Sequence, residues 1–231
     1  MKERIVNFNQ IVKDGLSKKK SLQEISLPDD LKAINILKFP GFIKVESSTY
    51  KNNLEINKLA FSSITLNRII NATVGILYAE DCFDIPILIF EKTELSRIIT
   101  YAFIDFIPLS RNNEYKKKYM DPLKSLSEEL DYIPGRNNSL SHPLGSPYPF
   151  SGFFKRNYKF STGVAMERYL ELWVSFLEKA TPLNSSDYSE EIRLNRKNFK
   201  NQFSFSYRNH RFLETILGKD FSKKLLKEIF L

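Results

Sequence analysis

The region from about residue 33 to residue 107 contains a succession of short β-rich runs, with polar turns such as Lys51-Asn52-Asn53 between them. Strands that follow one another through short links favour an antiparallel sheet. The run Ile85–Phe90 is apolar throughout, which predicts a central strand covered on both faces. The expected strands are Ile34–Phe39, Phe42–Glu46, Ile69–Tyr78, Ile85–Phe90 and Arg97–Ile107.

Segments with apolar residues at helical spacing lie on both sides of this region in the sequence. A turn at Leu27–Leu31 leads into the first strand, and one more strand is expected at Phe150–Lys159. Helices at both ends with a sheet between them favour a three-layer α/β/α sandwich with a central antiparallel sheet, formed by residues 1–231 as one domain. The expected helices are residues 3–16, 114–132, 164–178, 189–204, 212–217 and 221–230.

Two details concern the C-terminal half. Residues 133–149 are expected to be a loop, which is either functional or a surface excursion. His142 in this loop precedes Pro143 and is expected to be exposed to solvent. The helix over residues 164–178 has a stripe of residues that should be buried, namely Val164, Tyr169, Leu172, Trp173 and Phe176.

The charge of the chain indicates an acidic partner. There are 35 Lys and Arg residues against 27 Asp and Glu, so the net charge is +8. Such a protein attracts nucleic acid or a small acidic protein. The basic residues are not gathered with aromatic residues on one short segment, which argues against nucleic acid. The 19 Phe residues suit a flat conjugated ligand as well as ordinary core packing.

Several kinds of site are excluded by what the sequence lacks. A single cysteine, Cys82, cannot build a disulfide framework, a zinc site or an iron–sulfur site, and it fits a reducing compartment. The two histidines, His142 and His210, are too far apart in sequence to predict a histidine-rich metal site. No glycine-rich phosphate loop or G-x-S-x-G motif occurs. No apolar run is long enough to span a membrane, and the N-terminus lacks an apolar signal core.

Six segments together resemble motifs of the ferredoxin-dependent bilin reductases, and the phycoerythrobilin-forming branch is the most similar. Their order and rough spacing hold from about residue 28 to the end of the chain. The related red chlorophyll catabolite reductases share much of this pattern. The segments are Phe39–Phe42 (a P-G-F turn), Asp84–Ile87 (a D-[ML]-P turn), Ile104–Leu109 (a D-F-Q-P-L strand end), Tyr115–Leu130 (the following helix), Ser146–Arg156 (an S-P-x-x-x-F-x-R strand with altered spacing) and Arg211–Leu231 (the C-terminal signature).

The resemblance implies a mechanism and a set of partners. Reduced ferredoxin would deliver single electrons, no cofactor would be bound permanently, and no metal would take part. The bilin would become a radical to which side-chain acids supply protons. A heme oxygenase or another bilin reductase is a possible source of the substrate, and neither nucleic acid nor a membrane is expected to bind. The protein would work in the cytoplasm of a cyanobacterium or phage-infected host, or in a plastid stroma.

Four residues are, by this resemblance, candidates for catalytic proton transfer. Glu91 stands where the bilin reductases carry an aspartate and the chlorophyll catabolite reductases a glutamate. A carboxyl buried beside a tetrapyrrole can be a general acid, because burial raises its pKa; the alternative for Glu91 is an exposed strand-end charge paired with Lys92. Tyr207 replaces a second family aspartate, so its phenol or the nearby His210 donates a proton, or that role is lost. Asp105 either acts directly or orients a strand end.

Four further residues are candidates for substrate binding. Lys155 and Arg156 would bind the bilin propionates through charge-assisted hydrogen bonds, or would simply be a solvated strand end. Asn71 or Val74 falls near the position where some family members carry a histidine on the third strand. Asn209 lies between Tyr207 and His210 in the C-terminal region.

The resemblance therefore predicts ferredoxin-dependent reduction of biliverdin or dihydrobiliverdin in phycobilin biosynthesis. Two alternatives stay open. One is reduction of a chlorophyll catabolite. The other is a bilin-binding protein without catalysis, which the replacements at Glu91 and Tyr207 keep in consideration.

Overall fold

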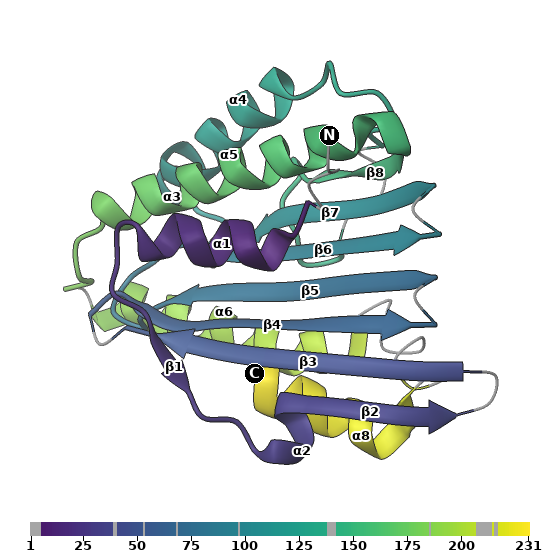
Figure 1. Ribbon diagram of the computed structural model, residues 1–231. Helices are drawn as coiled ribbons and strands as arrows, with labels where there is room; N and C mark the ends of the chain where they lie inside the picture. Colours follow the sequence, from purple (N-terminus) through teal and green to yellow (C-terminus); the bar gives the residue numbers. More distant parts are fainter. Residues whose placement is uncertain are drawn as a thin grey trace.

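The computed structural model describes residues 6–38, 41–52, 54–67, 69–96, 98–137, 142–184, 186–206, 214 and 217–231. Its centre is an eight-stranded antiparallel sheet with the order β1-β3-β4-β5-β6-β7-β8, in which β2 also pairs with β3 (Figure 1). The strands are β1 (Gln23–Ile25), β2 (Ala33–Lys38), β3 (Gly41–Lys51), β4 (Ile56–Leu66), β5 (Ile70–Ala79), β6 (Ile87–Leu95), β7 (Ile99–Ile107) and β8 (Phe150–Lys155).

Helices cover both faces of the sheet, so the expected three-layer α/β/α sandwich is confirmed (Figure 1). We call the two helical layers the α1–α5 layer and the α6–α8 layer, and the sheet faces that they cover the α1 face and the α6 face. The α1–α5 layer consists of α1 (Phe8–Ser17), α3 (Asn113–Tyr115), η1 (Lys116–Met120), α4 (Asp121–Glu129) and α5 (Lys159–Glu178). The α6–α8 layer consists of α6 (Ser186–Ser206), α8 (Lys219–Leu225) and η3 (Leu226–Phe230). Two short helices, α2 (Asp29–Lys32) and η2 (Arg156–Tyr158), lie at strand ends.

Strand β6 is the centre of the core, as its apolar sequence predicts. Residues 87–90 are buried, because helices lie on both sides of this part of the sheet. On the α1 face Phe90 meets Phe8 of α1 edge to face, with ring centroids 6.3 Å apart. Next to the strand, the Trp173 indole of α5 donates to the Pro86 carbonyl at 2.9 Å. The α1–α5 layer is thereby fixed on the strand that carries Glu91.

The sequence analysis missed two complete strands, the three-residue β1 and the much longer β4. Residues 59–62 of β4 are buried on both faces, so they show no regular alternation, and the strand contains Ser62 and Ser63 in the middle. Strand β3 likewise extends to Lys51, where a turn was expected. Tertiary packing outweighs local pattern for both strands.

Other predicted boundaries or positions differ from the structure. The last strand ends at Lys155, and α5 already begins at Lys159, where the sequence analysis expected strand. Val164 is 43% exposed and therefore not part of the buried stripe of α5. Residues 29–32 form the short helix α2 within the expected turn. The predicted helix over residues 212–217 lies mostly outside the described residues.

Candidate active site

Glu91 lies on the α6 face of the sheet. Side chains alternate along a strand, so Val74 shares a face with Tyr78 on β5. The Tyr78 ring contacts Phe199 of α6, with ring centroids 6.4 Å apart. Glu91 on β6 is directly opposite Val74 in the sheet register. The Glu91 carboxyl therefore faces the α6–α8 layer.

The interpretation of Glu91 as an exposed charge paired with Lys92 was wrong. Glu91 is only 8% exposed. Lys92 points to the α1 face, where its ammonium donates to Glu94 at 2.6 Å and lies 5.8 Å from the centre of the Phe8 ring. The side chains of Glu91 and Lys92, although neighbours on one strand, thus face different helical layers.

Among the described residues, the direct cross-strand neighbours of Glu91 are apolar. Val74 and Phe103 are its direct neighbours on β5 and β7. Side chains opposite each other in such pairs have Cβ atoms about 5 Å apart. The Thr93 hydroxyl, on the same face, lies 3.4 Å from the Glu91 carboxylate. Val74, one of the two residues near the family position for a third-strand histidine, is thus an aliphatic neighbour of the candidate acid.

Asn71 is three residues from Val74 and points to the opposite face, the α1 face. Its side-chain oxygen accepts from the Thr65 hydroxyl at 3.1 Å. The structure therefore does not bring this predicted substrate-binding residue together with Glu91.

Asp105 on β7 is a diagonal neighbour of Glu91 on the α6 face, since it pairs with Ile89. Its carboxylate is fully buried and accepts from the Ser146 backbone N–H at 3.1 Å and the Ser146 hydroxyl at 2.5 Å. Burial raises the pKa of Asp105 to about 8, although these hydrogen bonds and one from the Phe106 N–H act in the opposite direction. Gly145 is required beside it, because a Cβ there would lie 2.1 Å from the carboxylate.

The proline-containing loop is therefore packed onto the sheet rather than a surface excursion. The expectation that His142 is exposed to solvent was wrong. Its ring lies against Phe199 and Phe203 of α6, with centroids 6.4 and 6.3 Å away. Burial lowers the pKa of His142 to about 4, which keeps the imidazole neutral at physiological pH. The loop thus adds a further titratable residue to the α6 face.

Beyond Glu91, toward the β6–β7 turn, the α6 face carries exposed apolar side chains. Leu95, Ile99 and Phe153 are 48%, 42% and 59% exposed. Tyr101, one strand from Phe153, lies with its ring centroid 5.3 Å from that ring. Exposed apolar groups gathered on one face are a common sign of a binding surface.

Lys155 and Arg156 lie at the end of this apolar strip. Lys155 pairs with Ile99 and so belongs to the α6 face, roughly 13 Å along the strands and roughly 10 Å across them from Glu91. Both side chains are exposed and border a cavity of about 620 Å³. Its other lining residues are Ile98, Ile99, Asn157 and Phe160.

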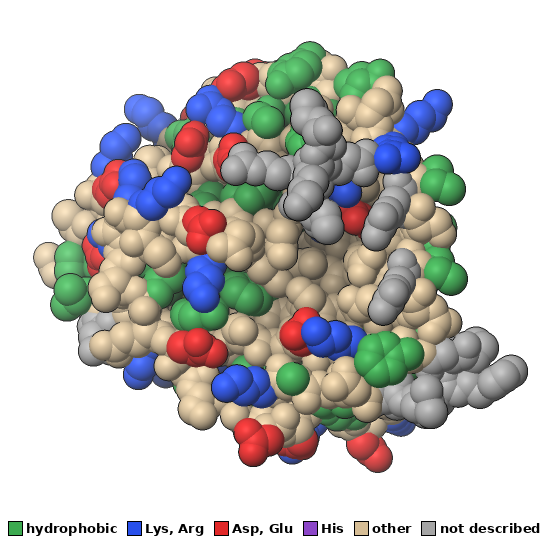
Figure 2. All heavy atoms as spheres, in the orientation of Figure 1, with side chains coloured by type: hydrophobic (Ala, Val, Ile, Leu, Met, Phe, Trp, Pro, Cys, Tyr) green, Lys and Arg blue, Asp and Glu red, His purple; other side chains and the backbone are tan. Residues whose placement is uncertain are grey.

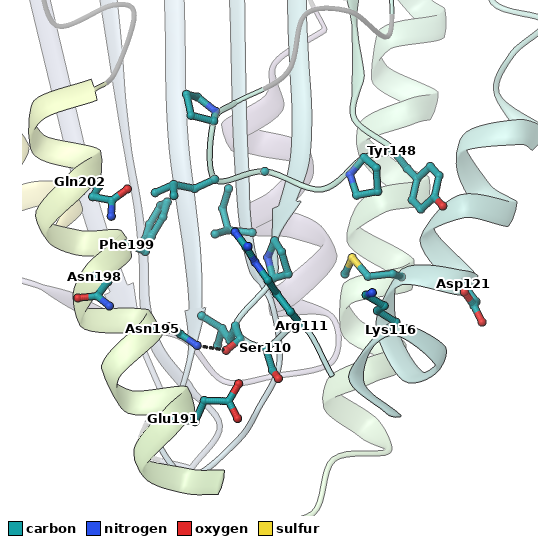
Figure 3. Close-up of a pocket in the computed structure, with 18 residues that line it drawn as sticks. Ser110, Arg111, Lys116, Asp121, Tyr148, Glu191, Asn195, Asn198, Phe199 and Gln202 are labelled. Carbon is teal, nitrogen blue, oxygen red and sulfur yellow. Dashed lines mark hydrogen bonds between the residues drawn. The ribbon is translucent and has the colours of Figure 1, made fainter. Parts of the chain in front are cut away.

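A second cavity, of about 740 Å³, lies at the opposite end of β7 (Figure 3). It is bounded by α6 on one side, where Asn195 donates to the Leu109 carbonyl at 2.9 Å, and by η1 on the other. Arg111 projects between them toward the loop that contains Gly145. Gly145, which lines this cavity, lies against the Asp105 carboxyl.

The remaining predicted residues, Tyr207, Asn209 and His210, lie outside the described residues. They follow Ser206, the last residue of α6. In the described part of the chain, no group of His, Cys, Asp and Glu side chains is arranged to hold a metal ion. No helix among the described residues has the length and apolar character to cross a membrane. The sequence analysis did not single out Thr93, Phe103 or Tyr101 for the site, because only strand register places them there.

The sequence profile of the ferredoxin-dependent bilin reductase family matches residues 9–231. The chain belongs to this family. It is therefore an oxidoreductase that acts on bilins with ferredoxin as electron donor. No match was found among curated proteins.

Two solved structures share the fold of this bilin reductase. Phytochromobilin synthase from tomato, in complex with biliverdin, has a TM-score of 0.77 at 16% identity, with 95% of this chain and 81% of that chain covered. The protein PcyX has a TM-score of 0.54 at 12% identity, with 96% and 95% covered.

Proposed function

We propose that this bilin reductase reduces biliverdin or dihydrobiliverdin on the α6 face of its sheet, as a step of phycobilin biosynthesis. The observation that carries the proposal is the position of Glu91, a buried carboxyl at the start of an apolar strip that ends at Lys155 and Arg156. The match over residues 9–231 supports residues 1–231 acting as a single bilin-reductase domain.

Glu91 is the proposed proton donor. Reduction of one double bond takes two electrons, delivered singly by ferredoxin, and two protons. A flat apolar pigment over Val74 and Phe103 would remove water from the carboxyl, which favours its neutral acid form. The second proton is assigned to Asp105, Tyr207 or His210, and Asp105 is buried on the same face.

The apolar strip and the basic residues at its end suit the pyrrole rings and the propionate groups of a bilin. Leu95, Ile99 and Phe153 offer apolar contact to pyrrole rings. Lys155 and Arg156 are suited to the propionate carboxylates, because charge-assisted hydrogen bonds are roughly twice as strong as neutral ones. Asn209, in the chain that follows α6, remains a proposed substrate contact.

Ferredoxin is proposed to dock on the α6–α8 layer. Its helices contain eight basic and five acidic residues, whereas those of the α1–α5 layer contain seven basic and eight acidic residues. Figure 2 shows the α1–α5 layer from outside, with basic and acidic side chains interspersed. Positive charge on the layer that covers Glu91 favours approach of an acidic electron donor to that side.

Lys58, a strand residue beneath Lys200 of the α6–α8 layer, adds to this charge. Lys200 of α6 lies 5.0 Å from the centre of the Tyr78 ring, and Lys58 on β4 pairs with Tyr78. Burial, followed by repulsion from Lys200, lowers the pKa of Lys58. An anionic partner would relieve this repulsion. The exposed thiol of Cys82 fits a reducing compartment such as the cytoplasm or a plastid stroma.

Absorbance spectroscopy tests the function. Purified protein mixed with biliverdin is expected to shift the pigment band, and addition of ferredoxin with a reducing system is expected to bleach or convert it. Binding without conversion would instead support a bilin-binding protein without catalysis, and conversion of a chlorophyll catabolite but not of a bilin would contradict the proposed substrate.

A further inference from the structure

The described residues satisfy only one nitrogen of the His142 imidazole. Its Nδ1 accepts from the Leu144 backbone N–H at 3.1 Å. A neutral imidazole that accepts at Nδ1 carries its proton on Nε2, so Nε2 is a donor. Nε2 is buried and has no hydrogen-bond partner among the described residues.

The ring is held in this position from several directions. The Gly145 backbone N–H donates to the His142 carbonyl at 2.9 Å, and the next residue, Ser146, is bound to Asp105. The ring itself lies against Phe199 and Phe203 of α6. His142 therefore cannot easily turn outward to hydrate its unsatisfied nitrogen.

An unsatisfied buried donor is costly, because on burial it loses its hydrogen bond to water and gains none in exchange. Most buried polar groups in proteins have a partner, which is protein, ordered water or ligand. Since His142 lies on the same face as Asp105 and Glu91, and against the helix that leads to Tyr207, the acceptor is most simply sought in the substrate of this site.

The chemistry of the donor selects the kind of acceptor. The imidazole is neutral here, because burial lowers its pKa. A neutral N–H donor among aromatic rings suits a neutral carbonyl oxygen better than a carboxylate, which would bring an unbalanced charge into the same apolar surroundings. An open-chain tetrapyrrole carries lactam carbonyl oxygens on its two terminal rings.

We propose that Nε2 of His142 donates a hydrogen bond to a lactam carbonyl oxygen of the bound bilin and so fixes which end of the pigment lies beside Asp105. This inference rests on the proposed function of the α6 face. The oxygen reaches Nε2 after a change of neighbouring side-chain rotamers, which is common when ligands or partners bind. His142 is thereby a substrate-binding residue contributed by the loop.

Two amide variants separate this role from a structural one. In His142→Asn the side-chain oxygen can still accept from the Leu144 N–H, but no group reaches the position of Nε2. In His142→Gln the longer side chain can place its N–H₂ group near that position. Biliverdin is titrated into wild type and both variants, with absorbance as the readout, and thermal melting of each is recorded.

We expect His142→Asn to raise the dissociation constant of biliverdin about 3- to 10-fold, as the loss of one hydrogen bond implies, and to shift the pigment band. We expect His142→Gln to bind within about two-fold of wild type, since it keeps the donor. Any other order of biliverdin affinities overturns the inference. Tight binding by His142→Asn would mean that water satisfies Nε2. Equal losses of affinity in both variants would mean that His142 has a packing role. Failure of the wild type to bind biliverdin would instead overturn the proposed function.

Discussion

The two faces of the sheet surround their buried carboxyl groups with different hydrogen-bond donors. On the α1 face Glu94 is held between two cations, at 2.6 Å from Lys92 and 3.3 Å from Lys159, and Lys92 also donates to the Val6 carbonyl. On the α6 face the donors to the buried carboxyl of Asp105 among the described residues are neutral groups of Ser146 and Phe106. The first arrangement keeps the Glu94 carboxyl ionised. The second allows the Asp105 carboxyl to be either protonated or ionised.

The pKa directions follow this difference. Burial alone would raise the pKa of both carboxyls. For Glu94, hydrogen bonds and attraction from Lys92 and Lys159 outweigh burial and lower the pKa. For Asp105 burial prevails, and the pKa rises to about 8. Proton chemistry at neutral pH is thus supported on the α6 face, and the ion pairs of the α1 face serve stability.

The largest expected effect is on catalysis at Glu91. Glu91→Gln should still bind biliverdin, because the amide keeps the shape of the side chain. Its rate of bilin reduction should fall about 100- to 10,000-fold, since an amide cannot donate a proton at neutral pH. Glu91→Asp, which restores the usual family residue, should keep substantial activity. Single-turnover decay of the pigment band with reduced ferredoxin measures all three proteins.

A control for this comparison comes from the α1 face. Glu46 forms an exposed pair with Lys44 at 2.8 Å, so Glu46→Gln should leave the reduction rate within about two-fold of wild type. Wild-type turnover by Glu91→Gln would remove Glu91 from the mechanism and leave Asp105, Tyr207 and His210 as the candidate donors.

The second effect is on stability. Glu94→Gln leaves the buried ammonium of Lys92 beside Lys159 without a carboxylate, which should cost about 3 to 5 kcal/mol in the free energy of unfolding. Urea denaturation measures the loss, and Glu46→Gln should change stability by less than about 1 kcal/mol. If Glu94→Gln instead loses bilin affinity at unchanged stability, the assignment of functions to the two faces is wrong.

The sequence predicted the three layers of this fold and identified Glu91 as a candidate proton donor. It could not show which residues lie beside the Glu91 carboxyl. Asn71 and Val74 are three positions apart, so their side chains lie on opposite faces of the sheet. A register shift of one residue would exchange these faces. Register is fixed by tertiary packing, here by contacts such as Tyr78 with Phe199. The burial of His142 was missed for a related reason, because long-range contacts such as that of Ser146 with Asp105 bring its loop onto the sheet.

The third effect is the pH dependence of stability. Asp105 has a folded-state pKa of about 8, above the model-compound value of 3.8 that it has when unfolded. Its stabilising contribution is therefore complete below pH 3.8 and is lost as the pH rises through 8. In Asp105→Asn this dependence should disappear, although the amide weakens the bonds to Ser146 and lowers stability overall. Denaturation midpoints of both proteins between pH 5 and pH 9 test this, and parallel curves would contradict it.

The smallest effect concerns the outer surfaces of the two helical layers. Lys197 and Lys227 are exposed residues of the α6–α8 layer, and Lys117 and Lys124 are exposed residues of the α1–α5 layer. Reversing both charges of the first pair to Glu should raise the KM for ferredoxin roughly five-fold at low salt, because charges at the rim of an interface mainly affect encounter. The same reversal of the second pair should leave this KM nearly unchanged. At high salt the difference should shrink, since ions screen exposed charges beyond about 10 Å. Biliverdin affinity should stay constant throughout. Equal effects of the two pairs would mean that ferredoxin senses only the net charge of +8 rather than the layer that covers Glu91.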